Sequence, residues 1–458
     1  MAAPAIKELG ALPVAPDVPM GLVERLHHVR KFDSGLGVIG AAGGPVTTVR
    51  VGPRGLVPPF VVVTSPQGAH DVLAASDGAF DKEMIVHVQN RVLGDNVFNL
   101  AHARWLARRR TLQPIFTKKH VVAFAGHMAA AAQAHADDMS QRGQVDLDQE
   151  MRHLTLEVVG KSVFGLDLGK DARAMGPHVR RVLQWVTNRS LRPVRSPMWL
   201  PTPARFRMRH SMAVLHALVD SAIDAAVAQP DGDAELVRLL LDATDPETGK
   251  PLTRKAVRAE LLVFMLAGHD TTATTLAYSL WALGRHPDVQ ERLVAEVAAL
   301  GDRTLTVGDV PSLPFTVQVI HEALRMCPPA PAIGRMAMRD VAVDGFRIPA
   351  GTNVVVGAYA IQHDARYWDE PERFDPDRFS VEQSAGRSRW QFFPFGAGPR
   401  SCIGDHFAML EATLALATVV RAADIESLDD VFPTALPFTM TAGGPIPARV
   451  RKRVNRTG

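Results

Sequence analysis

The feature that most constrains the fold is a helical pattern from Thr253 to Gly284 that contains no proline. At 1.5 Å per residue this pattern is about 48 Å long, enough to cross a whole molecule of this size. From Ala101 to about Leu300 the pattern is almost wholly helical, with breaks at 192–203 and 242–250. We therefore expect a mainly helical body with this long helix at its centre.

Short β patterns flank the helical body. Residues 46–51 and 60–64, on either side of a Gly-Pro-Arg-Gly turn, predict a hairpin, and Ser65 followed by Pro66 predicts the start of a helix. A second hairpin is expected around the Asp344-Gly345 turn. Since no repeat or linker interrupts the chain, we expect one domain, 46–458, after an N-terminal extension, 1–45. Its β-rich parts are expected at about 46–64, 333–357 and 433–452, and its helical parts at about 65–330 and 404–422.

Composition excludes several classes of protein. The chain has 458 residues, 47% hydrophobic and 22% charged, with a net charge of +3 that is too small to indicate nucleic-acid binding. Two cysteines, Cys327 and Cys402, provide no disulfide framework and favour a reducing compartment. The apolar run Leu261 to Ala267 is far shorter than a membrane span, and the N-terminal residues predict neither a signal peptide nor a membrane anchor. We expect a soluble cytoplasmic protein without a transmembrane anchor, and abundant Arg and Ala favour a bacterial source.

Cys402 lies in a glycine-rich loop that leads directly into an apolar helical run. Gly396 and Gly398 permit a tight backbone whose N–H groups can face the sulfur, and Arg400 adds a nearby cation. Both features lower the pKa of a thiol and favour the anionic form that binds metals. A lone cysteine can also be a small buried apolar residue, but this surrounding favours a haem-thiolate loop.

The ten residues from Phe395 to Gly404 match Phe-x-x-Gly-x-Arg-x-Cys-x-Gly, the signature of the cytochrome P450 superfamily, which the chain resembles from about Val46 to Arg451. The resemblance implies the cytochrome P450 fold and haem b bound through the sulfur of Cys402. A thiolate ligand pushes electron density onto iron and favours O–O cleavage. Phe395 and Gly396 are then expected at the haem. Arg400 departs from the His of many soluble bacterial members, which leaves the subfamily open.

The long helix carries Ala267-Gly268-His269-Asp270-Thr271 at its middle. Gly destabilises a helix interior and Thr can bond back to the carbonyl four residues earlier, so we expect a local opening there. The resemblance implies that Ala267 and Gly268 make room for dioxygen, while Asp270 and Thr271 are catalytic and relay protons. A polar helix patch is the alternative, and His269 is expected to be structural.

Glu322 and Arg325 lie three residues apart on a helix that ends before Pro328. Such pairs are usually solvated contacts worth a few tenths of a kcal/mol. The resemblance implies a structural triad with Arg373, from Pro371-Glu372-Arg373-Phe374, that fixes the loop before Cys402.

Haem propionates need cations or N–H donors. The resemblance implies this role for Trp105 and Arg109, which form a Trp-x-x-x-Arg motif, and for Arg335 and Arg400, with His102 a weaker candidate. Ordinary surface charge is the alternative for Arg109, Arg335 and His102.

Apolar residues at the family's substrate positions predict a lipophilic substrate such as a fatty acid, terpenoid or sterol. Each of them taken alone could be ordinary core. They are Met84, Ile85, Val97, Phe98, Phe264, Ala332, Ile333 and Phe438.

The resemblance implies a monooxygenase that inserts one atom of O2 into its substrate. Electrons would come indirectly from NAD(P)H through a separate ferredoxin or flavodoxin-type donor with its reductase. A basic group could steer an acidic partner, namely Arg104, Arg108, Arg110, Lys118 and Lys119. The alternatives are a peroxide-driven peroxygenase, which the Asp270-Thr271 pair disfavours, and a non-enzymatic haem protein that binds a gas or a lipid.

Overall fold

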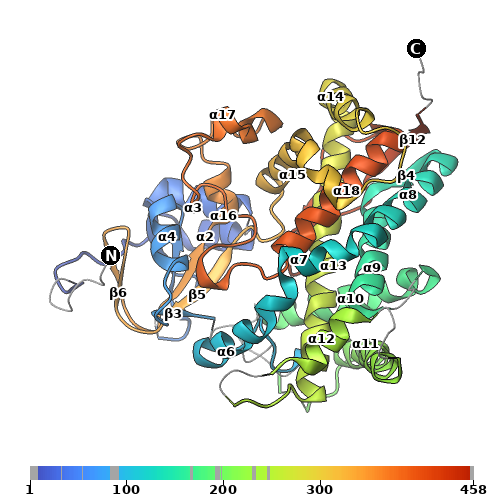
Figure 1. Ribbon diagram of the computed structural model, residues 1–458. Helices are drawn as coiled ribbons and strands as arrows, with labels where there is room; N and C mark the ends of the chain where they lie inside the picture. The colour runs from blue at the N-terminus through green and yellow to red at the C-terminus, as the bar shows by residue number, and fades with distance from the viewer. Residues whose placement is uncertain are drawn as a thin grey trace.

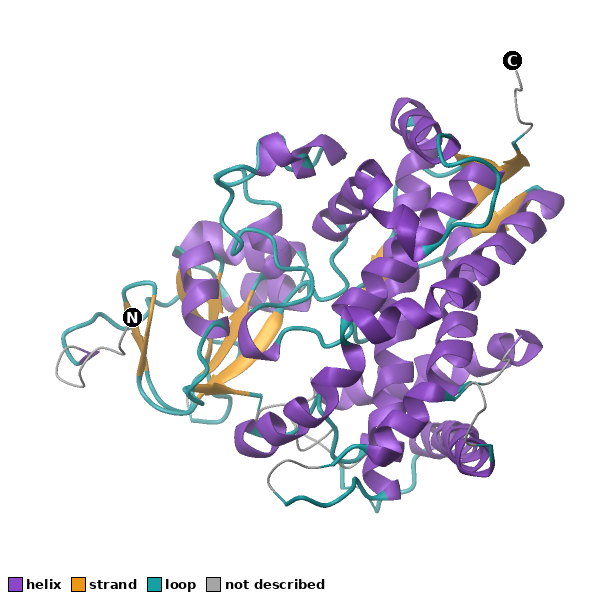
Figure 2. Ribbon diagram, in the orientation of Figure 1, coloured by secondary structure: helices purple, strands orange, loops and turns teal. Residues whose placement is uncertain are grey.

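The computed structural model describes residues 9–31, 33–53, 55–82, 92–165, 169–190, 196–197, 199–229, 234–244 and 248–453. These residues form a small β-rich lobe and a larger helical body (Figures 1 and 2). The mainly α fold with a small strand content is as expected.

The β-rich lobe is built on a five-stranded sheet in the order β1-β2-β8-β5-β3. Its strands are β1 Val46–Val49, β2 Phe60–Val63, β3 Phe80–Asp81, β5 Ile333–Ala337 and β8 Asn353–Val356. β1 and β2 form the expected antiparallel hairpin, and β2 pairs with β8 in parallel. The second expected hairpin is β6 Val341–Val343 with β7 Phe346–Ile348, and Asp344 and Gly345 at its turn both have positive φ.

Helices cover this sheet, and they include part of the chain that was expected to precede the domain. They are α2 Leu22–Arg30, α3 Ser34–Gly43, α4 Pro66–Leu73 and α16 Ala358–Gln362. α3 packs against β1, β2 and α16, and Asp17 bridges to Thr48 of β1. The described part of the expected N-terminal extension therefore belongs to the β-rich lobe. As expected, Ser65 caps α4, because its hydroxyl accepts the N–H of Gly68 at 3.1 Å.

The long helix α13, Arg254–Arg285, runs through the middle of the helical body (Figure 1). It packs against α9 Leu147–Phe164, α15 Pro314–Met326 and α18 Asp405–Ala422. A local opening was expected at Gly268, but α13 is α-helical throughout and is not broken there. The hydroxyls of Thr271, Thr274, Thr275 and Ser279 do bond the carbonyls four residues earlier, at 2.8–3.0 Å, without breaking the helix.

The remaining elements surround this centre. The helices are α6 His102–Leu112, α7 Lys118–Val121, α8 Ala125–Arg142, α10 Gly169–Ser190, α11 Pro203–Ala228, α12 Glu235–Asp242, α14 Pro287–Ala298 and α17 Val381–Ser384. Short 3-10 turns occupy Gln113–Phe116, Val122–Phe124, Val307–Ser312, Pro376–Phe379 and Gly398–Arg400. Strands β4 Gln144–Asp146, β12 Pro447–Lys452 and β9 Ala423–Ser427 form one sheet in that order, and β10 Thr434–Ala435 pairs with β11 Thr441–Ala442. Helix α11 is long and apolar enough by composition to cross a membrane, and it packs against α10 and α13.

Candidate active site

The loop around Cys402 is closed by its own backbone and clamped to the β-rich lobe. The N–H of Cys402 donates to the carbonyl of Phe395 at 2.8 Å, and the N–H of Ser401 donates to that of Gly398 at 3.1 Å. Gly398 has a φ of +72°, and a Cβ there would lie 1.9 Å from the carbonyl oxygen of Leu73 at the end of α4. Only glycine fits at this position, so α4 and the loop fix each other.

Cys402 lies three residues before α18, and part of the residue is accessible to solvent although protein atoms surround it. Burial by the surrounding protein raises the pKa of the Cys402 thiol, and Asp405 adds to the rise. The N–H of Gly404, together with Arg109 and Lys82, acts in the opposite direction. The chain thus offers partial stabilisation of a thiolate, and a bound cationic metal would complete it.

One face of α13 is open although the helix crosses the core. Ala267 is exposed and Gly268 and Thr271 are half-buried, while Leu266, His269 and Asp270 are buried. The hydroxyl of Thr271 donates to the carbonyl of Ala267 at 2.8 Å. The residues expected to make room for dioxygen are therefore accessible on one side of α13.

The side chains of Asp270 and Thr271 make contacts on different sides of α13. The carboxylate of Asp270 is buried against α9, where it forms an ion pair with Arg152. Arg152 also binds Asp148, with Nε 2.7 Å from Oδ2. Burial lowers the pKa of Arg152, but Asp270 and Asp148 outweigh burial, so the net shift is upward. The side chain of Asp270 thus lies on the side of α13 that faces α9.

His269 lies in the same buried contact. Its Nδ1 is 3.2 Å from the hydroxyl of Thr155, and burial lowers its pKa to about 4. It is therefore neutral at physiological pH and packs between α13 and α9, consistent with the expected structural role.

A buried group of cations lies beside the loop. Arg400 donates to Asp81 at 2.7 Å and to the carbonyl of Leu100 at 3.1 Å, and its guanidinium lies 4.3 Å from the centre of the Trp105 ring. Lys82 donates to the carbonyl of Phe98 at 3.0 Å. Sequence reasoning missed Lys82, whose only sequence signal is its place directly after Asp81.

These cations fit an anionic ligand. Burial lowers the pKa of Lys82, Arg335 and Arg400, and it lowers that of Arg335 to about 10. Arg400 lowers the pKa of both Lys82 and Arg335 further, and Asp81 is the carboxylate that opposes these shifts. Nε of Arg400 is buried and has no hydrogen-bond partner among the described residues. Three cations around one carboxylate can accommodate a group with two anionic arms, such as haem with its propionates.

A pocket gathers four of the residues expected to bind the cofactor. It is lined by His102, Trp105, Arg335 and Arg400, together with Val72, Leu73, Ala75, Phe80 and Pro399. Arg109 lies elsewhere, because its Nη1 donates to the carbonyl of Ser401 at 3.0 Å. Arg109 therefore holds the loop that carries Cys402 through the residue next to the cysteine.

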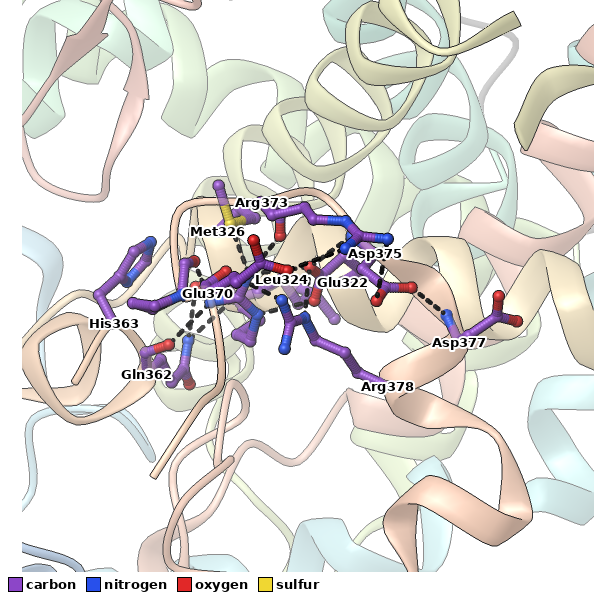
Figure 3. Close-up of polar contacts among 12 residues, drawn as sticks. Glu322, Leu324, Met326, Gln362, His363, Glu370, Arg373, Asp375, Asp377 and Arg378 are labelled. Carbon is purple, nitrogen blue, oxygen red and sulfur yellow. Dashed lines mark hydrogen bonds and ion pairs between the residues drawn. The ribbon is translucent and has the colours of Figure 1, made fainter. Parts of the chain in front are cut away.

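The buried triad has a different third member from the one expected (Figure 3). Glu322 and Arg325 form a fully buried pair, with Nε 2.7 Å from Oε2. The side chain of Arg373 is 62% exposed and binds Glu370, whereas buried Arg378 places Nε 3.5 Å from Oε1 of Glu322. The chain turns at Glu370, which has a positive φ, so Arg373 presents its carbonyl to Arg325 and its side chain to solvent.

The sequence carried a signal for this correction. Pro376-Asp377-Arg378-Phe379 repeats the pattern of Pro371-Glu372-Arg373-Phe374 five residues later. The N–H of Asp375, which lies between the two arginines, donates to Glu322 at 2.9 Å. This bond holds the segment that contains Arg378 next to Glu322.

The described residues expected to line the substrate site form separate contacts. Phe98 and Phe438 have ring centres 6.0 Å apart, and Phe264 lies 4.9 Å from Phe116. Ile333 borders the Cys402 loop, since its Cδ1 would lie 3.7 Å from a Cβ on Gly396. Val97 is buried and Ala332 half-buried, whereas Met84 and Ile85 lie outside the described residues.

Two members of the expected basic group, Arg104 and Arg108, are neutralised by ion pairs. Arg108 is mostly buried and binds Glu260, with Nη1 2.6 Å from Oε1, and Arg104 binds Asp95 at 2.6 Å. Arg110, Lys118 and Lys119 are exposed. Burial raises the pKa of Glu260 to about 7, against the effects of Arg108 and the N–H of Val97.

Comparison with known proteins agrees with this geometry. A family model described as "Cytochrome P450" matches residues 30–443. Cyclooctatin synthase of Streptomyces melanosporofaciens is 31% identical over 82% of each chain, and pentalenene oxygenase of Streptomyces avermitilis is 30% identical over 86% of this chain and 88% of its own. The crystal structure of the cytochrome P450DA haem domain superposes with a TM-score of 0.84 at 24% identity, covering 97% of this chain and 98% of that one.

Proposed function

This chain belongs to the cytochrome P450 family and is a P450 monooxygenase, and from that premise we propose that it inserts one oxygen atom into a lipophilic, terpenoid-like substrate. The observation that supports the proposal most strongly is the pairing of an exposed cysteine on a clamped loop with a buried cation group next to it.

Haem b fits these residues. The sulfur of Cys402 would hold the iron, and Arg335, Arg400 and Lys82 would hold the propionates, with Trp105 and His102 beside them. When bound, the haem would supply the iron that binds and activates dioxygen. The protein's own contribution is to fix the sulfur, neutralise the propionates and leave the Ala267 face of α13 open.

Proton delivery is assigned to α13. The hydroxyl of Thr271 now donates to the carbonyl of Ala267, and it can rotate to donate toward the open face instead. The side chain of Asp270 can turn toward the open face only when its ion pair with Arg152 opens. We therefore assign the direct donor role to Thr271 and a gated role to Asp270.

The substrate class is supported by two observations. The nominated wall residues are apolar or aromatic, which suits substrates with few polar groups. Two relatives are named cyclooctatin synthase and pentalenene oxygenase, and these names favour a terpenoid substrate. A terpenoid is therefore favoured over a fatty acid or a sterol.

Electrons would come from NAD(P)H through a separate ferredoxin or flavodoxin-type donor with its reductase, in the cytoplasm. An acidic partner would suit the exposed cations Arg110, Lys118 and Lys119. They are near in sequence to Arg109, which binds the carbonyl of Ser401 in the Cys402 loop. Arg108 is excluded from this surface by its ion pair with Glu260.

Labelled dioxygen tests the proposed reaction. Haem-loaded protein is supplied with NADPH, a ferredoxin and its reductase under ¹⁸O2, with pentalenene and dodecanoic acid as contrasting substrates. We expect a terpene product that carries one ¹⁸O atom by mass spectrometry, and little or no product from dodecanoic acid. Oxidation of dodecanoic acid alone would contradict the substrate class. Product formed equally well from hydrogen peroxide without NADPH would contradict the monooxygenase cycle.

A further inference from the structure

Glu260 is a fully buried carboxylate on α13 whose contacts are unlike those of an ordinary core residue. Its Oε1 accepts from Nη1 of Arg108 on α6 at 2.6 Å. The backbone N–H of Val97 donates to both of its oxygens, at 3.1 and 3.0 Å. Glu260 thereby ties three segments together, namely α13, α6 and the chain that precedes α6.

The tied segment, Gly94 to Asn99, is a turn that holds its own shape. Nδ2 of Asn99 donates to the carbonyl of Gly94 at 2.8 Å, and the N–H of Asn96 donates to Oδ1 of Asn99 at 3.0 Å. Asn96 and Asn99 are both fully buried, and Gly94 takes a positive φ beside Ala259 of α13. Because hydrogen bonds within the turn fix its shape, the bonds from Val97 to Glu260 position the whole turn relative to α13.

The turn carries two residues of the proposed substrate wall. Phe98 faces Phe438, and Lys82 binds the carbonyl of Phe98 from the side of the cation group. On α13, Phe264 and Ala267 lie four and seven residues after Glu260 and so share its side of the helix. Glu260 therefore holds the Val97–Phe98 wall against the side of α13 that carries Phe264 and Ala267.

A purely stabilising role does not require these groups. Well-packed apolar residues often replace a buried ion pair with no loss of stability. A tie through both oxygens does, however, fix one position, because each oxygen of Glu260 accepts from a fixed donor.

We propose that Glu260 is a positioning residue that sets the shape of the substrate pocket by holding the Val97–Phe98 wall in register with α13. The proposal rests on the proposed function only in that the same pocket takes the substrate. Its test therefore uses ligands whose binding requires no turnover.

The test compares two haem ligands of different size, imidazole and 4-phenylimidazole, by optical titration of the haem-loaded full chain. We expect the phenyl ring of 4-phenylimidazole to reach the wall and the smaller imidazole not to reach it. In Glu260→Gln we expect the ratio of the two dissociation constants to change by about tenfold, while the imidazole constant stays within about twofold of wild type. An unchanged ratio would overturn the proposal, whatever the outcome with ¹⁸O2.

A matched control is available at Glu296. This residue, on α14, likewise accepts two backbone N–H groups, from Phe315 and Thr316 at 2.6 and 2.8 Å, at the start of α15. Glu296→Gln should leave the ratio unchanged, and a change equal to that of Glu260→Gln would show a general stability effect and overturn the proposal. If Glu260→Gln gives no folded haem protein, Glu260→Asp, which keeps the charge but withdraws both oxygens from Val97, must show the altered ratio.

Discussion

Replacement of Arg378 by alanine should destabilise the protein by about 3 kcal/mol and prevent stable haem retention. Arg378 is buried beside Glu322, whose carboxylate is fully buried. Removal of one partner from a buried ionic network leaves charge without compensation, which typically costs about 3–5 kcal/mol. Burial already raises the pKa of Glu322, against the effects of Arg325 and Arg378. Loss of Arg378 would therefore remove one of the cations that stabilise the Glu322 carboxylate. Denaturant unfolding and the haem-to-protein absorbance ratio measure both effects.

Arg373→Ala is the matched control. Arg373 occupies the equivalent place in the preceding Pro-acid-Arg-Phe pattern, but its side chain is mostly exposed and pairs with exposed Glu370. We expect unchanged unfolding and full haem content for this variant. Equal damage from the two substitutions, or greater damage from Arg373→Ala, would contradict the assignment of Arg378 to the triad.

Gly398→Ala should abolish haem binding by displacing the Cys402 loop from α4. An alanine Cβ would lie 1.9 Å from the carbonyl oxygen of Leu73 and 3.1 Å from Cα of Ala74, so the backbone must move. The φ of +72° adds about 1–2 kcal/mol of backbone strain for a residue with a side chain. Haem content after reconstitution measures the effect directly.

Gly404→Ala, on the other side of Cys402, tests whether the effect is specific. A Cβ at Gly404 meets no protein atom within 4 Å, and the φ of −99° suits any residue. This variant should retain its haem and differ in stability by no more than about 1 kcal/mol. Loss of haem from Gly404→Ala with retention in Gly398→Ala would refute the clamp between α4 and the loop.

Local signals in the sequence predicted local structure well. Ser65 followed by Pro66 predicted a helix start, and the Ser65 hydroxyl does cap α4; the helical pattern from Thr253 likewise begins where the Thr253 hydroxyl caps α13. The Asp344-Gly345 turn follows equally from its own backbone preferences. In each case the partners of the interaction are near in sequence.

Features that depend on a distant partner were predicted less well. Whether Arg373 or Arg378 reaches Glu322 depends on the turn at Glu370, and both arginines sit in similar patterns. The side chain of Asp270 turns to α9 because Arg152 is there, which α13 alone does not reveal. Glu260 and Lys82 escaped notice for the same reason, since their partners are Arg108, Val97 and Phe98 on other segments.

The central claim is that the sulfur of Cys402 is the protein ligand of the haem iron, and the carbon-monoxide spectrum of the reduced protein tests it most directly. Wild-type protein should show the red-shifted Soret band that marks thiolate ligation, and haem-loaded Cys402→Ala should lack it. An unaltered carbon-monoxide band in Cys402→Ala would contradict the account.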